Sequence, residues 1–394
     1  MIPISNPAFV GNELQYVTDC VRSGWISSVG EYVQRFETAF ASFCGVDFAV
    51  TCSNGTTALH LALLALGVKP GDEVIVPTLT YVATANAVAY CGARPIFVDS
   101  EPDTWNMDPG RIEELITPRT KGIIVVHLFG HPVDMDRIQE IANRHGLFIL
   151  EDAAEAHGAE YKGRRVGSLG DAATFSFFGN KIITTGEGGM VTTRHRHIAD
   201  EVRRLKNHGM DPKRKYWFPT IGFNYRLTNV ASAIGLAQLE TIDWHLDQHR
   251  QVAAWYKEFL ADHPAFSWQP EKDWARHAWW LFTVLLDDTI PIDRFELLKR
   301  LVDHGVEGRQ IVYPITQLPP YATTTEGRSF PVADRVVNRG IHLPTWCGLT
   351  REQIAHICDC LVDCLDCSYA KENGDGMRRS AGRRRLPEQT QQSE

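Results

Sequence analysis

Lys181 is the residue of this chain whose surroundings suggest the most chemistry. It lies between the aromatic run Thr174–Phe178 and a glycine-rich turn that ends at Gly189. A lysine held in such a place can be desolvated, and desolvation favours the neutral amine. A neutral lysine can form a Schiff base with an aldehyde cofactor such as pyridoxal phosphate (PLP). The spacing therefore favours a cofactor-bearing lysine, against the general alternative that a lysine is a solvated surface charge.

An acidic run follows a short buried strand predicted at residues 146–150. It begins with Glu151 and Asp152 and continues to Glu155 and His157. Acidic residues at the C-terminal end of a parallel strand point into the crevice where α/β proteins bind ligands. Asp152 is suited to pair with a protonated pyridine nitrogen, which makes the ring an electron sink. Taken alone, Asp152 could equally be a helix N-cap.

A possible phosphate cradle comes earlier in the chain. The predicted strand Phe48–Cys52 is followed by a turn at residues 53–57 and by the strong helix former Ala58–Leu66. Free N–H groups and the dipole at a helix start attract phosphate, and an ordinary strand–turn–helix connection is the alternative. The turn is neither a P-loop nor a GxGxxG motif. Ser176, five residues before Lys181, could donate its hydroxyl to the same phosphate or be a polar strand residue.

The elements that must position these residues alternate between strand-like and helix-like segments from about residue 45 to 195. This alternation predicts an α/β domain with a mostly parallel sheet. The further predicted strands cover residues 74–77, 95–99, 122–127, 147–150 and 190–193. A long helical pattern at 229–261 leads to a second α/β unit, with a strand at 278–286 and helices at 292–304 and 351–367.

This organisation predicts three regions. We expect a large cofactor-binding domain at residues 1–240 and a small C-terminal domain at 241–369. Residues 370–394 are rich in Arg, Gly, Gln and Glu and have little to bury, which predicts a disordered tail.

The composition limits the compartment and the partners. The chain has 394 residues, of which 44% are hydrophobic and 22% charged, as in a soluble globular protein. The net charge of −8 argues against binding to nucleic acid or to an anionic membrane. The sequence shows neither a signal peptide nor an apolar run long enough to span a membrane, so we expect a cytoplasmic protein.

The nine cysteines do not form the pattern of a disulfide scaffold. Cys358, Cys360, Cys364 and Cys367 cluster with His356 near the C-terminus. Their spacing matches none of the common zinc patterns, so thiols that flank a buried helix face are favoured over a metal site, and no metal is expected.

Together these segments closely resemble the DegT/DnrJ/EryC1/StrS sugar aminotransferases, within the fold-type I PLP-dependent transferases. The resemblance runs from about residue 4 to 367, in the family's order of motifs. Its most specific motifs are 151–158 and 175–189, and supporting motifs cover 24–28, 53–57, 76–81, 222–226 and 340–344. The resemblance implies an α/β fold with a large domain, built on a mostly parallel mixed sheet, and a smaller C-terminal α/β domain.

The resemblance also implies roles for the cofactor residues. Lys181 would be the Schiff-base lysine and proton shuttle, and Asp152 would pair with the pyridine nitrogen. The phosphate would be held by Gly55, Thr56 and Ser176.

Three further cofactor contacts are implied. Tyr81 would stack on the ring, with a core aromatic as the alternative. Glu155 would lie near the cofactor's hydroxyl, where many relatives have glutamine. Asn224 would reach the phosphate from a second subunit, which implies a homodimer with shared active sites; a turn asparagine is the alternative.

The implied reaction moves an amino group from L-glutamate to a nucleotide-linked 4-keto-6-deoxy sugar. The segments 80–86, 90–92 and 216–219 are most similar to family members that turn GDP-4-keto-6-deoxymannose into GDP-perosamine, and His131, where relatives often have glutamine, is a departure. Amination at C3, a dTDP- or UDP-linked sugar, and a non-catalytic regulator on the same scaffold remain alternatives. A related dehydratase has histidine in place of the lysine, so Lys181 argues against it.

The residues that would hold the sugar nucleotide are predicted by position alone. The candidates are Tyr216, Trp217, Arg309 and His157. Arg309 could bind a diphosphate through two parallel hydrogen bonds or form a surface ion pair. His157 could touch the substrate or be a buried structural histidine.

Overall fold

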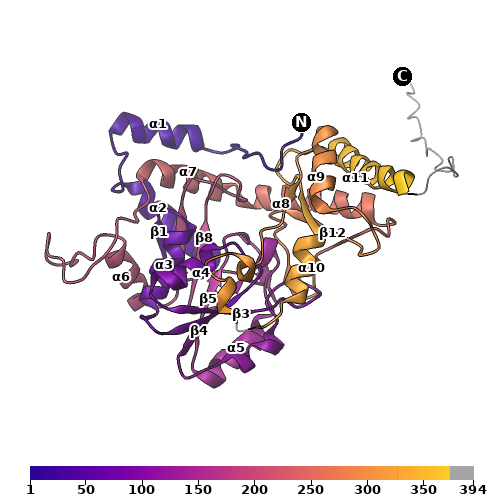
Figure 1. The fold of residues 1–394 in the computed structure, drawn as a ribbon. Coiled ribbons are helices and arrows are strands. Elements are labelled where there is room, and N and C mark those ends of the chain that lie inside the picture. Colours follow the sequence, from indigo (N-terminus) through magenta and orange to yellow (C-terminus); the bar gives the residue numbers. More distant parts are fainter. Residues whose placement is uncertain (326, 373–394) are drawn as a thin grey trace, which may run out of the picture.

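A computed structural model describes residues 1–325 and 327–372, with side chains described as far as residue 365. Two α/β domains lie next to each other in it (Figure 1). Most of the predicted tail, residues 373–394, lies outside the described residues, and residues 370–372 belong to the last helix, α11 (Arg351–Glu372). No helix within the described ranges combines the length and the apolarity that a membrane crossing requires.

A seven-stranded sheet forms the centre of the large domain. Neighbouring strands follow the order β1 (Phe48–Cys52), β9 (Gly189–Thr193), β8 (Ala172–Ser176), β5 (Phe148–Asp152), β4 (Thr120–Val126), β2 (Glu73–Pro77) and β3 (Arg94–Val98). The strands from β8 to β3 are mutually parallel, whereas β9 is antiparallel to both of its neighbours. The predicted α/β class with a mostly parallel sheet is therefore confirmed.

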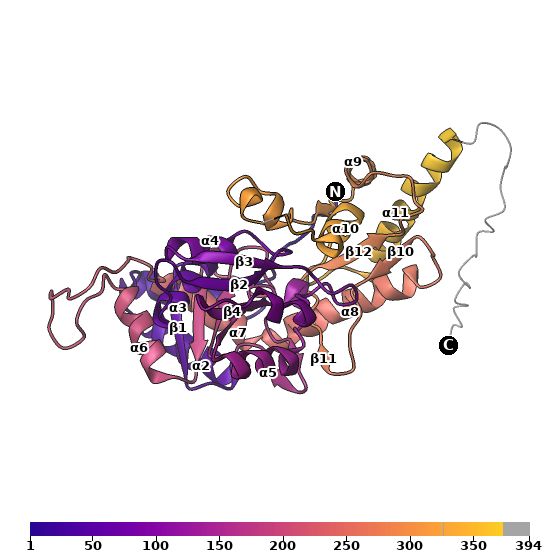
Figure 2. The same ribbon diagram turned by 60° about the horizontal axis from the view of Figure 1, so that its bottom comes forward.

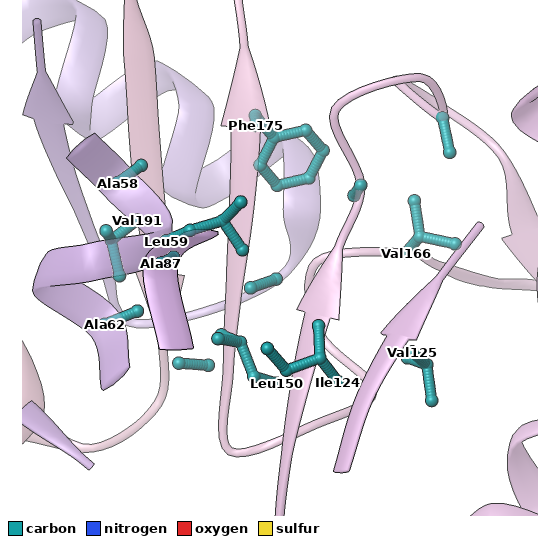
Figure 3. Packing of buried hydrophobic residues seen from close by; sticks show 14 of the residues in the cluster. Ala58, Leu59, Ala62, Ala87, Ile124, Val125, Leu150, Val166, Phe175 and Val191 are labelled. Carbon is teal, nitrogen blue, oxygen red and sulfur yellow. The ribbon is translucent and has the colours of Figure 1, made fainter. Parts of the chain in front are cut away.

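Helices cover this sheet (Figures 1 and 2). They are α1 (Glu13–Ser23), α2 (Glu31–Cys44), α3 (Gly55–Ala65), α4 (Ala83–Tyr90), α5 (Met135–His145), α6 (Arg196–Leu205) and α7 (Asn229–Glu240). Helix α3 is apolar on nearly every side, as expected of a helix that packs against β8 and β9 and between α4 and α6. Figure 3 shows Leu59 and Ala62 of α3 and Ala87 of α4 gathered against side chains of the central strands.

The small domain is built on a four-stranded antiparallel sheet. Its strands follow the order β10 (Phe266–Trp268), β12 (Phe282–Leu286), β14 (Gly340–Leu343) and β13 (Arg309–Gln310). Its helices are α8 (Ile242–Leu260), α9 (Arg294–Asp303), α10 (Pro331–Arg339) and α11. A third, three-stranded sheet joins β11 (Ala275–Arg276), β6 (Glu160–Tyr161) and β7 (Arg164–Arg165).

The predicted division at residue 240 remains a prediction. Two hydrophobic clusters are found among the described residues, and α8 contributes to both: Ile242 and Leu246 pack in the larger cluster, and Tyr256 and Leu260 in the smaller one. Helix α8 therefore joins the two cores.

Two predicted elements differ from the structure. The helical pattern at 229–261 forms two helices, because Thr241 has a φ of −113° and its hydroxyl donates to the Gln238 carbonyl at 3.2 Å. The predicted strand at 278–286 is shorter, since only Phe282–Leu286 joins the small sheet. The preceding segment, Ala278–Trp280, is instead hydrogen-bonded to the large domain.

Candidate active site

Several strand ends of the large sheet meet at one edge. Gly189, the first residue of β9, pairs with Ser176 at the end of β8 and with Cys52 at the end of β1. Asp152 ends the neighbouring strand β5. The fold thus brings the predicted phosphate and ring-nitrogen residues to the same edge, as the parallel topology requires.

The start of α3 forms a cradle at this edge. Asn54 caps the helix: its Oδ1 accepts from the Thr57 N–H at 2.9 Å, and its own N–H donates to the Thr57 hydroxyl at 3.2 Å. The N–H groups of Gly55 and Thr56 have no acceptor among the described residues. A Cβ on Gly55 would lie 2.9 Å from that of Ser176, so only glycine leaves the space open. An anion suits this place, because free N–H groups and the helix dipole both favour negative charge.

Ser176 lies beside the cradle. Its Oγ accepts from the Phe178 N–H at 3.4 Å, and its hydroxyl hydrogen has no acceptor among the described residues. Ser176 can therefore donate to an anion held at the start of α3.

Asp152 is a buried carboxylate with only part of its hydrogen-bonding capacity used. Its Oδ2 accepts from the Thr84 hydroxyl at 2.8 Å and its Oδ1 from the Ala154 N–H at 3.2 Å. Burial raises the pKa of Asp152, while these two bonds and the charge of Lys181 oppose the rise. Each oxygen retains a lone pair for a cationic N–H.

The neighbouring Glu151 is fully buried and anchors the end of β5. Its carboxylate accepts three N–H groups, from Gly167, Leu169 and Gly170, at 2.7–2.8 Å. It also accepts from Nε2 of His127 at 3.0 Å, because His127 Nδ1 is occupied by the Val133 N–H. Burial raises the pKa of Glu151, but these bonds outweigh that effect and lower it overall.

Lys181 lies in the turn between β8 and β9. Its Nζ is 4.0 Å from the centroid of the Trp280 ring and has no hydrogen-bond acceptor among the described residues. Burial lowers the pKa of Lys181, the charges of Glu155 and Asp152 oppose the fall, and the charge of Arg309 adds to it. The neutral amine is thus more accessible than in an exposed lysine.

Glu155 is a second acidic group near Lys181. Its Oε2 accepts from the Phe129 N–H at 2.9 Å. Burial raises the pKa of Glu155, and the charge of Lys181 opposes the rise. The two groups therefore stabilise each other's charged forms.

The predicted substrate-binding residues Arg309 and His157 differ in their surroundings. Arg309, on β13, lies close enough for its charge to lower the pKa values of both Lys181 and His342. His157 is fully buried and packs against Phe175 and Phe177, so its ring is not accessible to a substrate at the surface. Burial lowers the pKa of His157 to about 3.

Tyr81 is exposed just after the Pro77 end of β2, with 62% of its surface accessible. Its ring is free to pack on another group at the edge where the strands end.

The loop between α6 and α7 extends away from the body of the chain in both views (Figures 1 and 2). It carries Tyr216 and Trp217, which are 75% and 49% exposed, and Asn224, whose Oδ1 accepts from Arg226. The structure shows no contact between these residues and Lys181 of the same chain.

Three groups at the site were not predicted from the sequence: Thr84, the His127–Glu151 pair and Trp280. Glu151 precedes Asp152 on a strand, so strand alternation alone places its side chain on the opposite face from Asp152. Thr84 and Trp280 come from distant segments, and no local pattern marks them.

The donor set fits PLP. It combines an amine with a lowered pKa, a buried carboxylate for a ring N–H and a helix start with free N–H groups and a free hydroxyl. Within the described part of the chain, no cluster of three or more His, Cys, Asp or Glu could hold a metal ion. Cys358, Cys360 and Cys364 are buried on α11, and the side chain of Cys367 is outside the described residues.

Known proteins of similar sequence and structure include several that are named as aminotransferases or as GDP-perosamine synthases. The sequence model of the DegT/DnrJ/EryC1/StrS aminotransferase family matches residues 7–362. The GDP-perosamine synthase of Caulobacter vibrioides is 50% identical over 364 residues, which cover 90% of this chain and 96% of that protein. The GDP-perosamine synthase of Escherichia coli O157:H7 is 47% identical over 91% of this chain and 97% of its own length. The crystal structure of DesV from S. venezuelae, in complex with a ketimine intermediate, has a TM-score of 0.84 at 37% identity and covers 89% of this chain and 94% of DesV.

Proposed function

Because the chain belongs to the DegT/DnrJ/EryC1/StrS aminotransferase family, we propose that it transfers the amino group of glutamate to GDP-4-keto-6-deoxymannose and forms GDP-perosamine. The observation that carries the reaction type is the Lys181 amine, which lies over the face of Trp280 and whose pKa responds to the charges of Asp152 and Glu155. The likeness to two GDP-perosamine synthases supports the choice of sugar.

Family membership confirms three of the predictions from the sequence. The fold is that of the PLP-dependent sugar aminotransferases, the protein is an enzyme, and its cofactor is PLP. A keto sugar and an amino donor are its two kinds of substrate.

Each cofactor contact follows from a group described above. Gly55, Thr56 and Ser176 would hold the phosphate, Asp152 the ring nitrogen and Lys181 the aldehyde carbon. When bound, PLP supplies an aldehyde that takes up the amino group and a ring that delocalises the electron pair left after proton removal.

Lys181 moves the proton in both halves of the reaction. In its neutral form Nζ accepts the α-proton of the amino donor, and in its protonated form it gives a proton back. The lowered pKa of Lys181 makes the neutral form available, and Glu155 and Asp152 keep the protonated form within reach. Asp152, as a carboxylate, would accept the ring N–H; its bond from Thr84 opposes the effect of burial on its pKa.

The sugar nucleotide needs cationic and aromatic groups close to Lys181 to bind its diphosphate and its base. Arg309 would bind the diphosphate; its ion pair with Glu307 is long, at 3.9 Å, and its side chain is partly exposed. Tyr216 and Trp217 would contact the nucleotide from the extended loop of a second subunit.

A homodimer with shared sites accounts for this extended loop. Ile221, Tyr216 and Trp217 are exposed apolar side chains in a single chain, and such patches mark interaction surfaces. Asn224 would reach the phosphate bound in the partner's site. Cys20, Cys44, Cys52, Cys91 and Cys347 are free thiols, which supports the cytoplasm as the compartment.

A panel of substrates tests the proposal. The purified protein is supplied with PLP, glutamate and GDP-, dTDP- or UDP-linked 4-keto-6-deoxy sugars, and products are identified by mass and by NMR. We expect amination at C4 of the GDP-linked sugar, and none with Lys181→Ala. Amination of a different sugar nucleotide alone, or at C3, would overturn the substrate assignment.

A further inference from the structure

Trp280 is the small-domain residue that contacts the lysine. It immediately precedes β12 and is 8% exposed. One face of its indole lies 4.0 Å from Lys181 Nζ, and its Nε1–H donates to the Asn180 carbonyl at 2.7 Å. A single side chain thus contacts both the amine of Lys181 and the peptide that precedes it.

The backbone of Trp280 is itself fixed to the large domain. Its N–H donates to the Phe129 carbonyl at 3.1 Å, and the Ala278 N–H donates to the Gly130 carbonyl at 2.9 Å. Gly130 has a φ of +104°, and a Cβ there would lie 3.0 Å from the Trp279 N, so the close approach needs glycine. The position of the indole is therefore set by both domains.

The same contact between the two domains also involves Glu155. The Phe129 N–H, next to the carbonyl that Trp280 binds, donates to Glu155 Oε2 at 2.9 Å. Glu155 and Trp280, which both influence Lys181, are therefore both hydrogen-bonded to the backbone of Phe129.

The indole face has a direct electrostatic effect on the amine. The face of an aromatic ring attracts a cation more strongly than a neutral amine, most of all when both are partly desolvated. The charged groups that act on Lys181 are Glu155 and Asp152, which favour its cation, and Arg309, which opposes it. His157, whose pKa burial lowers to about 3, is neutral near pH 7.

We propose that Trp280 is a positioning residue that holds the Lys181 amine whenever that amine is not bonded to the cofactor. The inference rests on the proposed role of Lys181 as the cofactor-bearing lysine. Over one full catalytic cycle the amine would be released once, in the first half-reaction, and would have to return to the same carbon at the end of the second. A flexible four-carbon side chain held on an indole face stays close to its target, so less rotational freedom is lost on return.

The first test measures the amine itself in the cofactor-free protein. The rate of Lys181 modification by a small amine-selective reagent is followed against pH by peptide mass spectrometry. Trp280→Leu should lower the pH midpoint by about 0.5–1 unit, since the cation loses its aromatic partner. Trp280→Phe should give a smaller shift in the same direction, because phenyl is a weaker partner than indole.

The second test measures the return of the amine in the holoenzyme. Glutamate first converts the cofactor to its amine form, and 2-oxoglutarate is then added in excess. The recovery of the visible absorbance of the lysine-bound cofactor should be about tenfold slower in Trp280→Leu and less affected in Trp280→Phe.

Trp279→Leu is a matched control. Trp279 is the adjacent tryptophan, is also buried, and faces Lys257 at 4.1 Å rather than Lys181. This variant should lose stability without moving the Lys181 midpoint.

A folded Trp280→Leu protein with the wild-type midpoint and wild-type return rate would overturn the inference. If Trp280→Leu does not fold, wild-type values in Trp280→Phe overturn it instead. Neither test uses a sugar, so a wrong sugar assignment leaves both results intact. Failure of wild-type Lys181 to bond the cofactor would instead contradict the proposed function.

Discussion

The hydroxyl of Thr84 donates a hydrogen bond of 2.8 Å to Oδ2 of Asp152. Thr84 lies in the first turn of α4 and Asp152 at the end of β5, so the bond connects a helix to the strand end at the candidate site. Hydrogen bonds to a buried carboxylate favour its ionised form, and in its proposed role Asp152 would need that form to accept a ring N–H.

Thr84→Val should therefore weaken catalysis. The valine keeps the shape but removes the donor, so the pKa of Asp152 rises further. We expect kcat/KM to fall by about 10–100-fold, and the acid limb of the pH–rate profile to move to higher pH. Thr84→Ser, which retains the hydroxyl, is the control. Wild-type rates in Thr84→Val would show that this bond does not tune Asp152.

Gly55→Ala should weaken cofactor binding more than folding. Its methyl group would come within 2.9 Å of Ser176 Cβ and narrow the predicted phosphate cradle. Alanine is a better helix former than glycine, so the helix itself is not weakened. Spectroscopic titration with PLP should give a dissociation constant raised about tenfold or more, and thermal unfolding of the cofactor-free protein should change little. Equal PLP affinity in the variant would contradict the cradle.

Mixed dimers test whether active sites are shared. Lys181→Ala and Asn224→Ala subunits, each expected to be nearly inactive alone, are co-expressed with different tags. If Asn224 serves the partner's site, a mixed dimer has one site with both changes and one intact site. A random mixture should then recover about a quarter of wild-type activity.

The matched pair for this experiment is Lys181→Ala with Asp152→Ala. Both residues belong to the same chain's site, so every site in a mixed dimer is damaged and no activity should return. Recovery in this pair, or none in the first pair, would argue against sharing through Asn224.

Glu151→Gln should destabilise the protein in a pH-dependent way. The folded-state pKa of Glu151 lies below its usual value, so its stabilising effect is present above the unfolded-state pKa of about 4.3 and is lost as the pH falls through the folded-state pKa. Denaturant unfolding at pH 7 should show a loss of about 2–4 kcal/mol. The difference from wild type should begin to shrink only below about pH 4.3, and a difference that does not depend on pH would contradict the argument.

Sequence reasoning identified candidate residues for the centre of the site but missed several of the residues that contact them. Lys181, Asp152 and Ser176 lie in local motifs, and parallel strands bring their ends to one edge, so their meeting follows from topology. Trp280 and Thr84 depend on contacts between distant segments, which no spacing reveals. His157 shares a motif with Asp152, but the chain turns inward after Ala153, and its ring packs against Phe175 and Phe177.

The boundaries of helices and strands also depend on contacts that local sequence patterns do not reveal. Helical periodicity continues across Thr241, and the break between α7 and α8 is marked by the backbone conformation of Thr241 and the local hydrogen bonds of its hydroxyl. The apolar run 278–286 has the composition of one strand throughout, yet its first residues bond to Phe129 and Gly130 instead of to the small sheet. A tertiary contact here overrides a local preference.

That crossing of Ala278–Trp280 onto Phe129 and Gly130 has a consequence for anyone who recombines relatives of this enzyme. A chimera cut at the end of α7 would take Trp280 from one parent and Gly130 from the other. Grafts meant to alter sugar preference should therefore carry residues 129–130 and 278–280 as one matched unit. Libraries that exchange the two segments together should yield more active clones than libraries that exchange either alone.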